Sequence, residues 1–350
     1  MMTIHTFELS LIISNETARA YRDAFYTAAF GSHTRCYSDK AGWLKFSKWS
    51  EQGLLFALKK NDHTPGSTLK LRVNPTRLLG NPDAAALFLP DETSMRDLCD
   101  SLDEILRQLP FGPSIYAFKL NRLDLCRNIL AEDQEYIEEY IRLLHKGASA
   151  SGWTVQSFGD QRDQHSFRRI NENCQFTAYD KLYQIQDQHL STSWSQSPAI
   201  LRMEVSLFSS GITYQAEQLS IPQGRIWPAL MMDLSAHGTA IMWKIAGRLV
   251  PDSPYYTLRE AKSLIRQCQQ FSASKRQNLM DFLEKINRYD RLDRKQIQDF
   301  PNGRKRLKQL KKIGVNPVTI EARAGISFLP SVPQLINLGI IPQFEKCISA

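Results

Sequence analysis

The sequence predicts an α+β fold made of two fused strand–helix–strand units with mixed or antiparallel sheets, followed by a mainly helical region. Hydrophobic residues make up 42% of the 350 residues, which is enough for a sizeable core. Strand and helix patterns follow one another in a similar order in residues 4–87 and 93–208, and helical patterns dominate afterwards. We therefore expect one domain at 1–210 and a helical, basic C-terminal region at 211–350.

The first unit opens with an apolar strand over 4–13 and continues with a helix over 15–30. Residues 68–74 alternate between apolar and polar side chains, which predicts a half-buried strand. Asn74 and Pro75 then predict a turn.

The second unit begins with a helix over 93–109, for which Ser94 and Asp97 predict the cap. The hydrophobic spacing then predicts a strand over 115–128, a helix over 133–146, and strands over 174–185 and 200–208.

Helices are expected over 256–271, 274–289 and 303–313 in the C-terminal region. The last one contains no acidic residue, and its cationic residues are Arg304, Lys305, Arg306, Lys308, Lys311 and Lys312. Such a run is explained either by a solvated helix face or by a helix that binds DNA phosphates.

The composition favours a nucleic-acid partner and an intracellular protein. The chain carries 44 Lys and Arg against 36 Asp and Glu, a formal net charge of +8, which favours a polyanionic partner. Its six cysteines form no CxxC pair, which argues against a zinc ribbon and against a disulfide framework. No leader and no membrane-length apolar stretch is evident, so we expect a soluble, cytoplasmic protein without a membrane partner.

Three of the expected strands carry polar residues two positions apart, and such residues share one face of a sheet. If these strands are neighbours, a single face gathers Asp124, Tyr179, Lys181, Arg202 and Glu204.

This set of side chains suits metal-assisted phosphoryl transfer. Asp124 and Glu204 offer hard oxygen ligands to Mg²⁺ or Mn²⁺. The Tyr179 hydroxyl becomes a nucleophile when cations such as Lys181 lower its pKa. Arg202 would hold a phosphate through two parallel hydrogen bonds. Each residue also has an ordinary explanation, as a member of a cross-strand ion pair or as a sheet aromatic.

Four short segments follow one another at 69–80 (LKLRVNPTRLLG), 120–124 (LNRLD), 177–181 (TAYDK) and 201–205 (LRMEV). In this order they resemble segments of the filamentous-phage replication endonucleases, which initiate rolling-circle replication, and more distantly of the Rep_trans plasmid initiators. Residues 304–319 are similar to a basic helix and turn near the C-termini of the phage proteins.

The resemblance implies that residues 1–210 nick and rejoin DNA, with Tyr179 taking the 5′-phosphate of the cut strand. Asp124 and Glu204 would then hold the metal, and Lys181 and Arg202 would stabilise charge. The implied partners are phage or plasmid origin DNA, locally single-stranded at the nick, and a host helicase and DNA polymerase. We expect DNA contacts from Arg72, Arg77, Arg122, Arg304, Lys305, Arg306, Lys308, Lys311 and Lys312.

The sequence departs from the widespread rolling-circle initiators, because its seven histidines include no metal-binding His-x-His pair. Any metal would therefore sit on carboxylates, either with His165 as an added ligand or with His165 as a surface residue. We expect Tyr183 on the same strand as Tyr179, as a neighbour that stacks a base. Two alternatives stay open: a non-catalytic, sequence-specific DNA-binding protein, and a metal-dependent nuclease that uses water.

Overall fold

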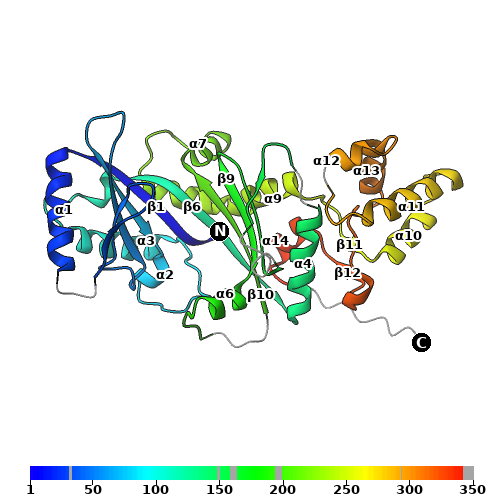
Figure 1. The fold of residues 1–350 in the computed structure, drawn as a ribbon, viewed down its shortest axis with the longest axis horizontal. Helices are drawn as coiled ribbons and strands as arrows, with labels where there is room; N and C mark the ends of the chain where they lie inside the picture. Colours follow the sequence, from blue (N-terminus) through cyan, green and yellow to red (C-terminus); the bar gives the residue numbers. More distant parts are fainter. Residues whose placement is uncertain (31–33, 148–149, 158–163, 194–198, 293, 342–350) are drawn as a thin grey trace.

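A ten-stranded sheet forms the centre of the computed structural model, with strands in the order β2-β3-β4-β5-β1-β6-β10-β9-β8-β7. Neighbouring strands run antiparallel, and helices cover one face, which confirms the α+β class (Figure 1). The structure describes residues 1–30, 34–147, 150–157, 164–193, 199–292 and 294–341.

The two halves of the sheet share one plan. Each consists of a long strand, a helix and a four-stranded meander whose last strand returns beside the long strand. The first half contains β1 (Thr3–Ile13), α1 (Asn15–Ala29), β2 (Cys36–Ser38), β3 (Leu44–Phe46), β4 (Leu54–Lys60) and β5 (Ser67–Val73). The second contains β6 (Lys119–Ala131), α4 (Gln134–Gly147), β7 (Thr154–Val155), β8 (Ser166–Ile170), β9 (Cys174–Asp180), α6 (Lys181–Asp187) and β10 (Ala199–Phe208). The two halves meet where β1 pairs with β6.

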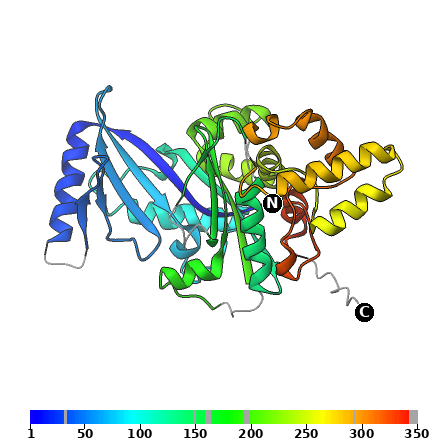
Figure 2. The ribbon, with the colours of Figure 1, turned by 45° about the vertical axis from the view of Figure 1, so that its right-hand side comes forward.

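One face of the sheet is apolar along its whole length and packs against helices. Phe25 of α1 stacks on Phe46 of β3 with ring centroids 4.3 Å apart. Phe7 of β1 stacks on Trp227 of α8 (Trp227–Ala236) with centroids 5.5 Å apart. Figure 2 shows α1 and α4 beside the two halves. The opposite face carries the polar side chains, and it is the face on which the candidate site lies.

The helical C-terminal region is confirmed. Helices α7 (Ser209–Gln218), α8 and α9 (Gly238–Leu249) pack against the sheet, and the backbone N–H of Met2 donates to the carbonyl oxygen of Ser235 in α8. The next helices lie at the end of the molecule away from α1 (Figure 1) and are α10 (Leu258–Gln267), α11 (Ala273–Asn287), α12 (Arg294–Gln298) and α13 (Gly303–Lys312).

Two short strands pair beyond α9, and a last helix returns to the sheet. The strands are β11 (Tyr255–Tyr256) and β12 (Phe328–Leu329), and the last helix is α14 (Val332–Leu338). Two other helices, α2 (Pro75–Leu78) and α3 (Glu92–Leu106), link the two halves of the ten-stranded sheet. No helix in the described ranges has both the length and the apolar character that crossing a membrane requires.

Three predicted boundaries are wrong. The strand expected from 115 begins at Lys119, because a short 3₁₀ turn (Ile115–Ala117) precedes it. The cap of α3 is Asp91, whose carboxylate accepts from the backbone N–H of Ser94 at 2.8 Å, so Asp97 has no part in it. The strand expected over 174–185 ends at Asp180, where α6 begins.

Candidate active site

The candidate site lies on the polar face where β6, β10 and β9 run side by side. Glu204 on β10 stands opposite Cys126 on β6, and Arg202 stands opposite Tyr179 on β9. Asp124 lies two residues before Cys126 on the same strand. The three strands are therefore neighbours, which is the condition under which the alternation of polar side chains gathers these residues on one face.

A bulge in β1 brings two further side chains to this face. Two residues of β1, His5 and Thr6, stand against one residue of β6, Asp124. His5 Nδ1 lies 3.0 Å from Glu204 Oε1, and the Thr6 hydroxyl donates a hydrogen bond to Asp124 Oδ2. The bulge thus aims one polar side chain at each of the two acidic residues.

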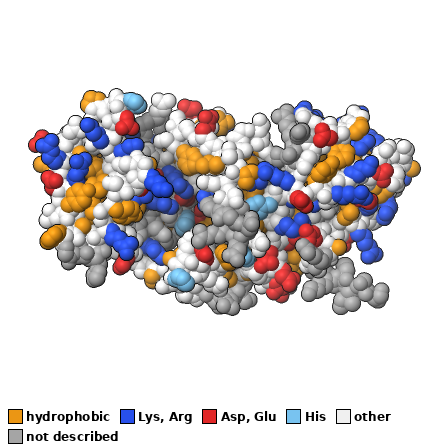
Figure 3. Space-filling model, in the orientation of Figure 1, with side chains coloured by type: hydrophobic (Ala, Val, Ile, Leu, Met, Phe, Trp, Pro, Cys, Tyr) orange, Lys and Arg blue, Asp and Glu red, His pale blue; other side chains and the backbone are white. Residues whose placement is uncertain are grey.

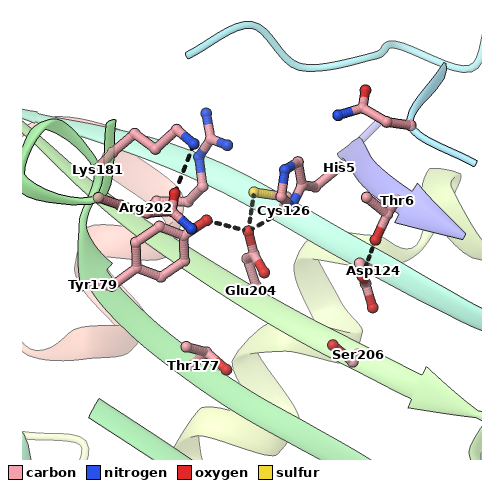
Figure 4. Close-up of polar contacts among 12 residues, drawn as sticks. His5, Thr6, Asp124, Cys126, Thr177, Tyr179, Lys181, Arg202, Glu204 and Ser206 are labelled. Carbon is pink, nitrogen blue, oxygen red and sulfur yellow. Dashed lines mark hydrogen bonds and ion pairs between the residues drawn. The ribbon is translucent and has the colours of Figure 1, made fainter. Parts of the chain in front are cut away.

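Glu204 Oε1 is the centre of the polar network. The Tyr179 hydroxyl donates a hydrogen bond to it at 2.6 Å, and the Cys126 thiol lies 3.7 Å away (Figure 4). Burial by itself would raise the pKa of Glu204, but His5 and Arg202 outweigh burial and hold the pKa well below its usual range. Glu204 is therefore an ionised acceptor at neutral pH.

The same surroundings keep the Tyr179 phenol protonated. Its side chain is buried, and burial raises the pKa of Tyr179 well above the usual value for a tyrosine. The negative charge of Glu204 raises this pKa further, whereas the positive charge of Arg202 lowers it. Tyr179 is therefore a neutral hydroxyl whose proton already points at a carboxylate.

Arg202 is completely buried behind this pair. Its Nε donates to Asn128 Oδ1 at 2.7 Å, and its Nη2 donates to the carbonyl oxygen of Ala85 at 2.6 Å. Its Nη1 is buried and has no hydrogen-bond partner among the described residues. The two parallel hydrogen bonds to a phosphate that the sequence predicts are therefore not available in this arrangement. Arg202 instead supplies a buried positive charge next to Tyr179.

Lys181 lies at the first turn of α6 and not on a strand, so its expected place on the sheet face is wrong. It nevertheless stays near the site, where it is buried and its Nζ donates to Gln184 Oε1 at 2.8 Å. Burial and the charge of Arg202 lower the pKa of Lys181 to about 7, although Glu204 opposes the shift. The ammonium group is therefore easily deprotonated near neutral pH.

Asp124 has its own partners and stays outside the Glu204 network. Arg122 Nε donates to Asp124 Oδ1 at 2.7 Å, and Arg122 Nη2 donates to the Ser206 hydroxyl at 3.0 Å. The part of the chain that the structure describes has no group of three or more His, Cys, Asp or Glu side chains placed to hold a metal ion. Asp124 and Glu204 nevertheless line the same cavity.

This cavity has a volume of about 270 Å³ and is lined by arginines, tyrosines and carboxylates. Its charged lining residues are three arginines and four carboxylates: Arg72, Arg122, Arg168, Asp124, Asp180, Asp187 and Glu204. The arginines suit the oxygens of a phosphodiester, whereas the carboxylates suit a divalent cation that would bind together with it.

Tyr183 reaches the cavity from α6 and not from β9, so its expected place on the strand of Tyr179 is wrong. Its ring stacks on His165 with centroids 3.7 Å apart and an interplanar angle of 12°. His165 Nδ1 lies 3.6 Å from Asp180, so this histidine belongs to the Tyr183 side of the cavity and not to the Glu204 network.

The residues expected to bind DNA fall into two groups. Arg72 and Arg122 stand on either side of Glu8 in the sheet register, and Arg77 lies on α2. The cations of α13 are exposed, except for the half-buried Arg306, whose guanidinium lies 5.5 Å from the ring centroid of Phe282.

Sequence reasoning missed His5 and the contact between Arg202 and Ala85. Two adjacent polar residues, His5 and Thr6, interrupt an otherwise alternating strand, which is the pattern that a bulge leaves in a sequence. No local sequence pattern predicts the contact between Arg202 and Ala85, because these residues lie 117 positions apart.

No model of a known protein family matches the chain, and no curated protein is similar to it. What this site does therefore has to be inferred from the placement and charge of its own side chains.

Proposed function

We propose that this protein initiates rolling-circle replication of phage or plasmid DNA by nicking and rejoining one strand at the origin. The hydrogen bond from the Tyr179 hydroxyl to the ionised, buried Glu204, in a cavity lined by arginines, is the observation that carries the proposal. A nucleophile, a proton acceptor and phosphate-binding groups are thereby next to one another.

In the proposed reaction the Tyr179 oxygen attacks the phosphorus atom while the bond from phosphorus to the 3′ oxygen breaks. The phenol proton leaves along its hydrogen bond to Glu204 Oε1 and is passed on to the leaving 3′ oxygen, so that Glu204, whose pKa lies well below its usual range, is not left protonated. The products are a 5′-phosphotyrosine and a free 3′ hydroxyl. One phosphodiester replaces another, so the reverse reaction reseals the strand.

The positive charges would have separate tasks. Arg202, next to the phenol, would stabilise the negative charge that develops on Tyr179. Arg122 and Arg168, which line the cavity, would bind the non-bridging phosphate oxygens.

Mg²⁺ or Mn²⁺ remains part of the proposal. Mg²⁺ usually keeps several waters and binds through one or two carboxylates together with a substrate phosphate. Glu204 and Asp124 suit binding of this kind, because both line the cavity that would receive the phosphate. The bound ion would supply charge stabilisation at a phosphate oxygen.

The resemblance to the phage endonucleases also implies the roles of the two regions and the partners. Residues 1–210 would carry the nicking reaction, and the basic α13 would contact duplex DNA. A host polymerase would extend the 3′ end in the cytoplasm of a bacterial cell, with a host helicase as a second partner.

A covalent-adduct assay tests the reaction. Wild-type protein is incubated with supercoiled DNA of its own replicon and Mg²⁺ or Mn²⁺, and labelled DNA attached to protein is detected on a denaturing gel. We expect an adduct that Tyr179→Phe abolishes and that Tyr183→Phe, a matched change in the same cavity, retains. EDTA should abolish nicking and the adduct together.

The other outcomes would each reject the proposal in favour of a stated alternative. Nicking without an adduct would identify a nuclease that uses water. An adduct that survives in Tyr179→Phe but not in Tyr183→Phe would move the nucleophile to α6. DNA binding without cleavage under any metal would identify a non-catalytic binding protein.

A further inference from the structure

A second, larger cavity lies next to the candidate site, over the first half of the sheet. This groove has a volume of about 1300 Å³ and is lined by residues of β2, β4 and β5, the β3–β4 connection, α2 and the end of α1. Thr6 and Arg72 line both the groove and the Tyr179 cavity. The two spaces therefore meet at these residues, on the polar face of the sheet.

The groove is strongly cationic. Its charged lining residues are Arg35, Lys48, Arg72 and Arg77 against a single acid, Glu51. Within the described ranges none of the four cations takes part in an ion pair, whereas neighbouring lysines do, in the pairs Lys45–Asp39, Lys59–Asp62 and Lys70–Glu8. Figure 3 shows lysine and arginine side chains gathered over this part of the molecule. Lys48 Nζ lies 4.7 Å from the ring centroid of Trp49. Cations that form no ion pair along a groove suit a chain of phosphates.

An aromatic side chain accompanies these cations. Tyr37 of β2 lines the groove and is 47% exposed, although most large aromatic residues of this half are buried in the core. Proteins that bind single-stranded nucleic acid combine a positively charged groove with aromatic rings on which bases stack. A paired base inside a duplex cannot offer its face to such a ring.

We propose that this groove binds single-stranded DNA next to the scissile phosphate, so that the strand runs from the Tyr179 cavity past Arg72 towards Arg35 and Tyr37. The inference rests on the proposed function for the chemical step, but it concerns binding alone. It gives a place on this chain to the locally unpaired DNA that the resemblance implies. It also assigns roles to Arg35, Lys48 and Tyr37.

Binding without chemistry tests the inference. Fluorescence anisotropy in EDTA measures the affinity of the full chain for a labelled oligo(dT) of about 20 nucleotides and for a duplex of the same length. The test variant is the double substitution Arg35→Gln/Lys48→Gln. The matched control is Arg19→Gln/Arg22→Gln, two exposed arginines of α1, which covers the opposite face of the sheet.

We expect the groove variant to weaken oligo(dT) binding about tenfold and to reduce the slope of log affinity against log salt by about 1.4, which is the loss of two single-strand phosphate contacts. The control should stay within about twofold of wild type for both ligands. Tyr37→Leu should weaken oligo(dT) binding about tenfold without changing the salt slope, because stacking is not ionic.

Three results would overturn the inference: an unchanged affinity in the groove variants, an equal loss in the α1 control, or a loss of duplex binding as large as the loss for oligo(dT). The adduct assay tests the proposed function independently of the groove. An adduct with no effect of the groove variants would reject the groove alone. Groove-dependent oligo(dT) binding without any adduct would reject the nicking reaction and leave the groove in place.

Discussion

Tyr179, His5 and Cys126 all contact one carboxylate oxygen of Glu204, and the first two, with Arg202 nearby, explain how a tyrosine with a raised pKa can still act as a nucleophile. Tyr179 donates to Glu204, His5 lies on the same oxygen, and Arg202 lies behind them. The phenol stays protonated while the cavity is empty of phosphate. In the proposed reaction its proton moves over a single existing hydrogen bond, and Arg202 offsets the charge that remains on the phenol.

Lys181 gives this site a measurable dependence of stability on pH. Its pKa is about 7 in the folded chain against 10.5 for an ordinary lysine, because the side chain is buried next to Arg202. Between these two pH values the unfolded chain binds more protons than the folded chain, so the free energy of unfolding rises with pH, by up to about 1.4 kcal/mol per pH unit. Below pH 7 both states are protonated, and the full cost of burying the charge is present.

Lys181→Met should therefore be more stable than wild type at pH 6.5, by up to several kcal/mol, and should lose this advantage as the pH approaches 10. Urea denaturation of both proteins between pH 6.5 and 9.5 measures the difference. A difference in unfolding free energy that stays constant over this range would show that Lys181 is charged in the folded protein at all these pH values.

The alternation of polar residues places Asp124, Tyr179, Arg202 and Glu204 on one face once their strands are neighbours, and the pairing of β6, β10 and β9 meets that condition. The partner of Glu204 on β1 could not be predicted in the same way. His5 reaches Glu204 only because the β1 bulge turns it to the polar face, and a bulge is a property of the pairing with β6 rather than of one segment.

The start of α6 decides where Lys181 and Tyr183 lie, and Asp180 sets it. Its Oδ1 accepts hydrogen bonds from the backbone N–H groups of Leu182 and Tyr183, at 3.0 and 3.1 Å. Alternation over 177–183 imitates a strand, but the buried pair Lys181 and Ile185 is spaced by four residues, as on a helix. A short segment of this kind fits both the two-residue period of a strand and the 3.6-residue period of a helix. The cap at Asp180 therefore decides where the strand ends and the helix begins.

Asp180→Ala should reduce the free energy of unfolding by about 1–2 kcal/mol, because it removes the cap of α6. Asp180→Asn should retain most of the stability, since asparagine caps helices about as well as aspartate does. Urea denaturation of the two variants at pH 7 makes the comparison. An equal loss in both would assign the stabilisation to the contacts of Asp180 Oδ2 with Gln134 and His165 instead of the cap.

The fold class and the division into two units could be predicted, because both follow from the order of local patterns. A sheet system shared by the two units is also expected from this order, but the strands that join them could not be identified, since the pairing of β1 with β6 connects residues more than 100 positions apart. The consequence for function is large. One continuous polar face places the tyrosine site of the second half beside the cationic groove of the first, with Arg72 and Thr6 at the junction.

The basic helix α13 lies at the end of the molecule away from the groove, so DNA that contacts both would extend along the whole protein (Figure 1). Three of its exposed lysines are Lys308, Lys311 and Lys312. If they bind duplex phosphates, replacing all three with glutamine should weaken duplex binding at every sequence and reduce its salt slope by about 2.7. Arginine at the same positions keeps the charge and should preserve the slope.

The separation between α13 and the groove allows a further test of DNA binding by α13. Substitutions in α13 and in the groove share no contacts, so their effects on binding free energy should add when both sites hold the same DNA molecule. A duplex with a single-stranded extension should then lose affinity in both variants, and the combined variant should show the sum of the two losses in anisotropy titrations. An unchanged duplex slope in the glutamine variant would instead leave α13 as a solvated helix face.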